Sequence, residues 1–230
     1  MLTRVAKKNI IGYRNIYIIS YDDSIIIDGC ITISETIFPF SISTLNTYFS
    51  KYTDKLNRTG WYLQQLLKLY AGIVIPNILE TYLILDADVF FLKSTVFLEN
   101  DKFIFTVGDE YHLPYFEHMS RLSNTFIKNE EKSGISHHMI FNIHIIKEIF
   151  HIVESIMLEP FWVVFIKMVD KQNYQLSGAS EYELYFNYII KKYPEKVIIR
   201  SLKWKNIKFT YDMNFDDNLD FVSLCDWWHK

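Results

Sequence analysis

Residues 82–91 read YLILDADVFF, in which four apolar residues precede an Asp-Ala-Asp triplet. A short run that is apolar at every position predicts a strand covered on both faces. In open α/β sheets, ligands bind at the carboxyl ends of such strands. Because side chains alternate along extended backbone, Asp86 and Asp88 are predicted to project to the same side. The stretch therefore predicts an α/β protein with two carboxylates converging at the edge of its sheet.

Strands and helices are predicted to alternate around this stretch. Short apolar runs predict strands at 15–20, 30–34, 103–107 and 137–143. Apolar residues spaced three and four apart, or helix-boundary residues, predict helices at 60–70, 145–158, 160–169 and 180–192. Ser180 is the predicted N-cap of the last helix, with Glu183 as its capping-box partner. The alternation predicts a mainly parallel central sheet flanked by helices.

Composition narrows the class of protein. The chain has 230 residues, of which half are hydrophobic and 22% are charged, and this excludes intrinsic disorder. A formal charge of −3 argues against a nucleic-acid partner, and two cysteines exclude a disulfide framework. With neither a transmembrane window nor a signal peptide recognised, we expect one soluble, cytoplasmic domain over residues 1–230. Its core is expected over about 10–205, with a C-terminal extension at 206–230.

The two aspartates suggest a metal site. Converging carboxylates repel each other unless a cation or a proton joins them. Oxygen ligands suit Mg²⁺ or Mn²⁺, which proteins commonly share with substrate phosphates. A pair of this kind can also simply cap a strand or bind backbone amides. The position of Asp86 and Asp88 after an apolar strand favours the metal-binding reading.

Two neighbouring histidines form the second candidate group. Adjacent residues on a strand point to opposite faces, so at most one of His137 and His138 is predicted to enter the site. A neutral imidazole is an acceptable Mn²⁺ ligand and a hydrogen-bond donor to sugar or phosphate. We favour His138 and leave His137 open.

Carboxylates later in the chain are candidates for acid–base chemistry. Glu183 has a structural task in the capping box, whereas Glu181 has none. If the reaction inverts a sugar's configuration, Glu181 is the predicted base that deprotonates an acceptor hydroxyl. Asp109 and Glu110 are the alternatives, and they could instead hold the acceptor.

Four blocks occur in a fixed order along the chain: RTGWYLQQLLKL at 58–69, YLILDADVFFL at 82–92, SHHM at 136–139 and SEYE at 180–183. In this combination the chain resembles a little-characterised family of predicted glycosyltransferases with a GT-A-type nucleotide-sugar fold, from bacteria and large DNA viruses. The resemblance covers about residues 10–205. It implies transfer of a sugar from a nucleoside-diphosphate donor, with UDP as the commonest case, to a carbohydrate or other hydroxyl acceptor.

The resemblance also implies roles for individual residues. Asp86 and Asp88 would hold Mn²⁺ or Mg²⁺ against the donor diphosphate, with Asp88 as the more direct ligand. The loop after the first strand, Ser20, Tyr21 and Asp22, would touch the nucleotide base. Some GT-A families supply a further metal ligand from a C-terminal histidine, which here would be His229.

Polar residues of the 58–69 block are candidates for donor binding. Arg58 carries a fork of donors that suits phosphate. One of Gln64 and Gln65 is predicted to face the site and the other to be solvated.

Two other classes compete with a transferase. A haloacid-dehalogenase-like phosphatase also uses an Asp-x-Asp motif after an apolar strand, with Asp86 as nucleophile and Asp88 as general acid. However, 85 residues precede Asp86, whereas that nucleophile normally ends the first strand of its domain. The other alternative is a non-catalytic carbohydrate- or nucleotide-binding module.

Overall fold

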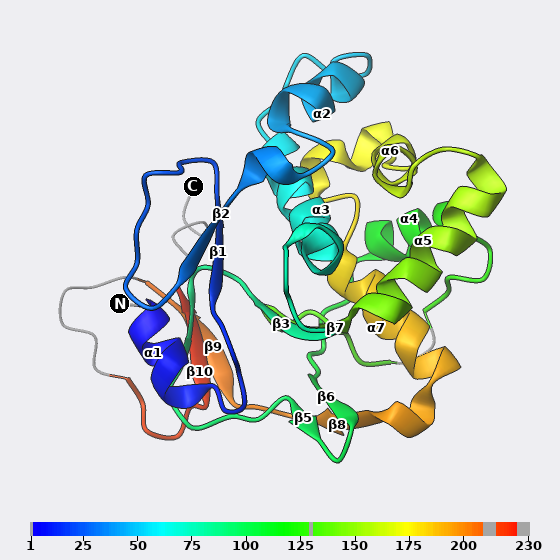
Figure 1. The fold of residues 1–230 in the computed structure, drawn as a ribbon. Helices are drawn as coiled ribbons and strands as arrows, with labels where there is room; N and C mark the ends of the chain where they lie inside the picture. The colour runs from blue at the N-terminus through cyan, green and yellow to red at the C-terminus, as the bar shows by residue number, and fades with distance from the viewer. Residues whose placement is uncertain (1, 129–130, 209–214, 225–230) are drawn as a thin grey trace.

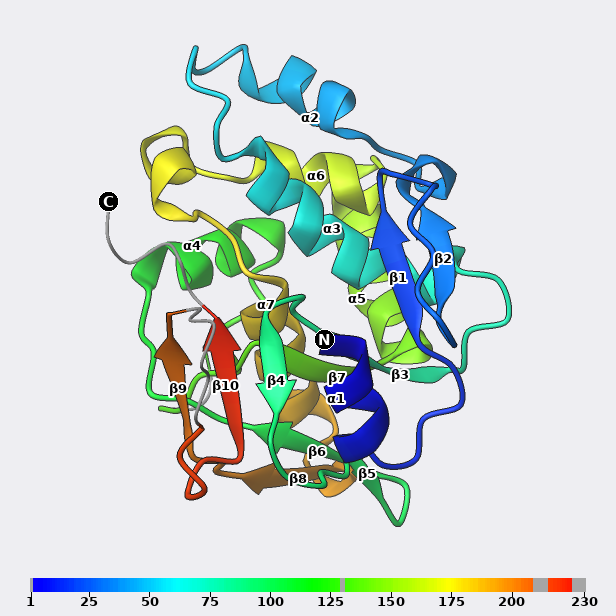
Figure 2. The ribbon, with the colours of Figure 1, turned by 90° about the vertical axis from the view of Figure 1, so that its left-hand side faces the viewer.

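A computed structural model describes residues 2–128, 131–208 and 215–224 and shows a mixed α/β fold. Its strands are β1 (Tyr17–Ser20), β2 (Ile31–Ser34), β3 (Thr81–Leu85), β4 (Val89–Phe91), β5 (Leu98–Glu99), β6 (Lys102–Thr106), β7 (His138–Asn142), β8 (Val197–Arg200), β9 (Trp204–Ile207) and β10 (Phe221–Leu224). Its α-helices are α1 (Leu2–Asn9), α2 (Ile42–Phe49), α3 (Thr59–Val74), α4 (Leu113–Leu122), α5 (Ile143–Met157), α6 (Phe161–Lys167) and α7 (Glu181–Lys192). Short 3₁₀ helices are η1 (Glu35–Ile37), η2 (Lys171–Leu176) and η3 (Pro194–Lys196). The helices α2 to α7 gather on one side of the molecule, whereas α1 lies beside β4 on the other (Figures 1 and 2).

The strands pair in both directions. β1 with β2, β6 with β8 and β9 with β10 are parallel, whereas β3 with β7, β5 with β6 and β4 with β10 are antiparallel. The prediction of a mainly parallel sheet was therefore wrong in this respect. An apolar run marks a strand, but it does not encode the direction of its partner, which depends on how the chain returns.

The antiparallel pairing of β3 with β7 has a direct consequence for the site. Its register sets Leu85 opposite His138. Asp86, one residue beyond β3, therefore comes to lie beside His137, one residue before β7. Two segments separated by fifty residues of chain meet at this end of the sheet.

Helix α3 packs closely against β3 because of one glycine. A Cβ atom added at Gly72 would lie 2.3 Å from the ring of Tyr82, a distance that real side chains do not tolerate. The absence of a side chain at this position allows the helix to approach the strand. Helix α3, which contains the helix predicted at 60–70, therefore packs directly against β3.

The last predicted helix forms as α7, and its N-cap is confirmed. The hydroxyl of Ser180 accepts a hydrogen bond from the backbone N–H of Glu183 at 3.2 Å. The carboxylate of Glu183 accepts from Ser133 and Asn187. Glu183 is thus fully buried and tied to the loop before β7 and to its own helix.

The C-terminal strands complete the fold on the side of α1. β10 lies between β4 and β9, and its Phe221 and Val222 are fully buried (Figure 2). This strand falls in the stretch that we expected to be an extension.

Within the described residues, no single helix is long and apolar enough to cross a membrane. Helices α5 and α6 together have the length and apolar composition of a membrane span, but the pair is bent by 70°.

Candidate metal and active site

The turn between β3 and β4 holds the two aspartates of the central motif. The backbone N–H of Asp86 donates to the carbonyl of His137 at 3.0 Å, and Val89 donates to the carbonyl of Asp86 at 3.2 Å. The carbonyl of Asp88 accepts from Leu224 of β10 at 2.8 Å. The backbone of the turn is therefore anchored on both sides.

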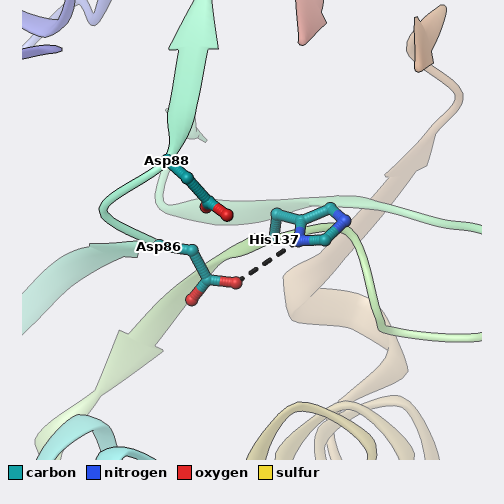
Figure 3. A group of neighbouring side chains, drawn as sticks. All are labelled: Asp86, Asp88 and His137. Atoms are coloured by element: carbon teal, nitrogen blue, oxygen red, sulfur yellow. Dashed lines mark ion pairs between the residues drawn. The ribbon is translucent and has the colours of Figure 1, made fainter. Parts of the chain in front are cut away.

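Asp86, Asp88 and His137 converge on one point (Figure 3). One potential ligand atom from each residue lies within 4.8 Å of the others. The Nδ1 atom of His137 lies 3.4 Å from Oδ2 of Asp86. His137 has φ of 61°, in the left-handed region that a residue with a side chain seldom adopts. Strained backbone of this kind persists where the surroundings impose it, and it is concentrated at functional sites.

Behind this cluster lies the positively charged side chain of a buried lysine, which the sequence analysis did not identify. The Nζ atom of Lys68 lies 2.5 Å from Oδ1 of Asp86 and 2.8 Å from Oε1 of Glu181. The hydroxyl of Tyr182 also donates to Oδ1 of Asp86, at 3.1 Å, and its ring lies 4.4 Å from the Lys68 ammonium. The sequence did contain an indication of this role for Lys68. It is a charged residue inside a mostly apolar helix, three residues after Gln65 and four after Gln64.

This network shifts the pKa values of its members in opposite directions. Burial opposes ionisation of Asp86, but Lys68 and then His137 outweigh it, so the pKa of Asp86 falls below its usual range. Burial, followed by the charge of Asp86, raises the pKa of Asp88. Burial also raises the pKa of Glu181, although Lys68 acts against this shift. Burial lowers the pKa of Lys68, but Glu181, Tyr182 and Asp86 together hold it well above its usual value.

The donor set fits a small divalent cation. Two carboxylates and an imidazole are ligands that Mn²⁺ accepts, and Mg²⁺ takes the carboxylates. Among the described residues, Oδ1 of Asp88 is a buried oxygen with no hydrogen-bond partner. An orphaned buried oxygen costs free energy unless something binds it, and a cation between the three side chains would do so.

The geometry reverses our preference between the two histidines. His138 points into the core, where its ring packs against Phe91, Phe97 and Phe221, and its Nε2 lies 2.9 Å from the hydroxyl of Thr106. Burial lowers its pKa to about 3. The reason is where the strand begins: β7 starts at His138, whose side chain points inward, whereas His137 precedes the strand in left-handed backbone and lies beside Asp86.

The two glutamines lie in different environments, and the donor contact predicted for one of them stays a prediction. Gln64 is exposed, whereas Gln65 is buried and its Oε1 accepts a hydrogen bond from the backbone N–H of Glu181 at 3.1 Å. Gln65 therefore fixes the first turn of α7, and with it Glu181, against α3.

Arg58 lies at the other end of α3. It occupies the N-cap position, donates to the hydroxyl of Ser177, and its guanidinium lies 5.1 Å from the centre of the Trp61 ring. Ten residues separate it from Lys68, or about 15 Å along the helix axis. Arg58 is thus not among the groups that contact Asp86.

The residues of the loop after β1 that were predicted at the nucleotide base hydrogen-bond to their neighbours in the chain. Ser20 accepts from the backbone N–H of Asp22, and Asp22 accepts from Ser24. Tyr21 is 84% exposed. The role predicted for this loop at the nucleotide base stays a prediction, and His229 lies outside the described residues.

The two predicted catalytic carboxylates occupy different environments. Glu181 is 1% exposed and lies against Lys68. Asp109 is exposed, pairs with Lys132, and lines a cavity of about 470 Å³ together with Trp204. The Trp204 ring meets the ring of His137 edge to face, with 5.0 Å between centres. Trp204 therefore lies between this cavity and the aspartate–histidine cluster.

Comparison with known proteins assigns a family. The sequence model described as "Family of unknown function (DUF6492)" matches residues 14–193, which include Lys68, both aspartates of the cluster, His137 and Glu181. No curated protein matches the chain. Among solved structures, the chain is similar to mouse xyloside xylosyltransferase 1 in its apo form, with 12% identity and a TM-score of 0.35 over 86% of this chain and 76% of that one. Because the family model covers most of its length, the chain belongs to DUF6492, a family of unknown function.

Proposed function

We propose that this protein is a metal-dependent glycosyltransferase that moves a sugar from a nucleoside-diphosphate donor to an acceptor hydroxyl. The observation that carries the proposal is the convergence of Asp86, Asp88 and His137 beyond the end of β3, supported from behind by a buried lysine. Two carboxylates and an imidazole that converge in this way form a donor set for a divalent cation that substrate phosphates can share.

The chemistry of the reaction calls for such a site. Breaking a sugar–phosphate bond leaves negative charge on the departing nucleoside diphosphate. Asp86, Asp88 and His137 are the residues that would hold Mn²⁺ or Mg²⁺, and the bound cation would supply a Lewis acid that stabilises that charge.

Lys68 orients the metal-facing side of Asp86. It engages Oδ1 together with Tyr182, which leaves Oδ2 on the side of His137. Because both contacts are made by buried groups on packed helices, the carboxylate is held in one orientation before any ligand arrives. The ion pair also offsets the negative charge that Asp86 and Glu181 bring into the interior.

The acceptor hydroxyl must lose a proton, and the two carboxylates differ in their access to it. Glu181 is enclosed between Lys68 and Gln65, so we assign it the role of holding the Lys68 side chain in position. Asp109 is exposed and borders the cavity beside Trp204, so it is the carboxylate that an acceptor can reach.

Calorimetric titration of UDP and GDP tests the proposal. UDP should bind in the presence of Mn²⁺, and an excess of EDTA should weaken its binding at least tenfold. Asp88→Ala should remove the effect of Mn²⁺ while far-UV circular dichroism stays unchanged. Glu117→Ala, which removes an exposed carboxylate from α4, is the matched control and should bind as the wild type does. Wild-type affinity in Asp88→Ala would overturn the assignment of the site.

A further inference from the structure

We propose that the cavity beside Trp204 is the acceptor site, and that the acceptor is a glycoside with an apolar aglycone. The inference rests on the proposed transferase function and names the substrate class that this function would use. Three features carry it: the position of the cavity, the polar groups on its walls and an apolar hollow that adjoins it.

The first feature is position. Trp204 contacts the ring of His137 and also lines the cavity. One side of its indole is occupied by Phe221, whose ring lies parallel to it at 5.3 Å. A molecule in the cavity would therefore lie one aromatic ring away from the cluster that is proposed to hold the donor. Group transfer requires donor and acceptor to be adjacent in this way.

The second feature is the character of the walls. About 470 Å³ falls within the range of roughly 300–1,000 Å³ that small-molecule sites occupy. Asp109 and Lys132 form an ion pair on one wall, and Lys203 lies near Trp204 on another. A carboxylate that accepts hydrogen bonds, ammonium groups that donate them and an apolar aromatic surface match the hydroxyls and C–H groups of a sugar ring.

The third feature is a hollow of about 230 Å³ next to this cavity. Val107 and Lys132 line both spaces, so the two adjoin at these residues. The remaining walls of the hollow are apolar: Phe186, Ile190, Pro194, Val197 and Ile199. Ile199 is 48% exposed, so burying it under a ligand would gain hydrophobic free energy.

These two spaces together select the acceptor. A free monosaccharide would fill the polar cavity and leave the apolar hollow in water. A glycoside with an alkyl or aryl aglycone would place its sugar against Trp204 and its apolar part against Ile190 and Ile199. The adjacency of the two spaces at Val107 and Lys132 thus favours the glycoside.

The test compares methyl and octyl glycosides of glucose, galactose, mannose and xylose. Each is titrated below its micellar concentration into the full chain with Mn²⁺ and UDP. For at least one sugar, the octyl glycoside should bind at least tenfold more tightly than the methyl glycoside. Ile199→Ser should reduce this ratio to less than threefold without changing the affinity for the methyl glycoside. Trp204→Leu should weaken binding of both glycosides at least fivefold.

The controls separate this inference from the proposed function. Ile156→Ser removes an isoleucine of similar exposure from α5 and should leave every affinity unchanged. Because Trp204 packs on Phe221, retained binding of UDP with Mn²⁺ must show that Trp204→Leu is folded, and Ile199→Ser tests the inference without that risk. If UDP binds with Mn²⁺ but no glycoside binds, or if octyl and methyl glycosides bind equally, the acceptor inference is wrong and the donor site stands. If glycosides bind as expected but UDP never requires the metal, the transferase proposal is the one that fails.

Discussion

Replacement of Lys68 by methionine tests the charge network on which the site is built. The variant keeps a long apolar side chain in α3 but removes the cation from Asp86 and Glu181, whose side chains are 18% and 1% exposed. Removing one partner of a buried ion pair typically costs about 3–5 kcal/mol, because the other charge is left uncompensated. We therefore expect Lys68→Met to lower the free energy of unfolding by about 3–5 kcal/mol in EDTA.

Urea unfolding followed by tryptophan fluorescence measures this change. The double variant Lys68→Met/Glu181→Gln should recover part of the loss, because one buried negative charge is removed together with the positive one. Mn²⁺ should stabilise Lys68→Met more than the wild type, since the metal replaces a missing positive charge beside Asp86. The matched control is Lys167→Met, which breaks an ion pair with Glu159 at 2.6 Å on the surface and should change stability little.

The reasoning would be refuted by either of two results. A loss below about 1 kcal/mol for Lys68→Met would mean that the buried pairs contribute no more than surface pairs do. A double variant no more stable than Lys68→Met would mean that Glu181 does not share the lysine's charge.

Three further predictions concern the histidines and one glycine. His137→Ala should weaken Mn²⁺ binding at least tenfold in calorimetry and leave the free energy of unfolding nearly unchanged. His138→Ala should instead lower the free energy of unfolding in urea by about 2–4 kcal/mol, because it opens a cavity in the core. The opposite pattern would restore His138 as the ligand. Burial lowers the pKa of His118 to about 4, so between pH 6.5 and 4 the unfolded chain binds a proton at this residue that the folded chain does not, and His118 should contribute a loss of stability of about 1.4 kcal/mol per pH unit as pH decreases. Burial lowers the pKa of His138 as well, so His118→Asn should reduce the total slope by the share of one histidine, and an unchanged slope would show that His118 does not contribute. In Gly134→Ala the new Cβ atom would lie 2.5 Å from the Cβ atom of Phe186, so this variant should lower the free energy of unfolding by about 1–3 kcal/mol, measured by heat or urea. An unchanged stability would mean that α7 can shift away from the new methyl group.

Some features of this protein follow from the sequence because their causes are local. Short apolar runs placed β1 and β3, helical apolar spacing placed α3, and the boundary residues Ser180 and Pro194 placed α7, whose N-terminus the hydroxyl of Ser180 caps. An Asp-Ala-Asp triplet after an apolar run was enough to single out two residues of the candidate site, because two carboxylates this close in sequence suggest a cation site by themselves. These inferences depend on residues within a few positions of one another.

Other features were decided by contacts between segments far apart in the chain. Which histidine meets Asp86 depends on the antiparallel register of β3 and β7, which sets Leu85 opposite His138, and no local pattern encodes a strand's partner or its direction. Lys68 becomes part of the site only because α3 packs behind β3 and brings it to Asp86 and Glu181. The sequence by itself determined several of the helices and strands and the pair of aspartates, whereas the charge balance and the ligand geometry around them arise only when packing brings distant residues into one low-dielectric space.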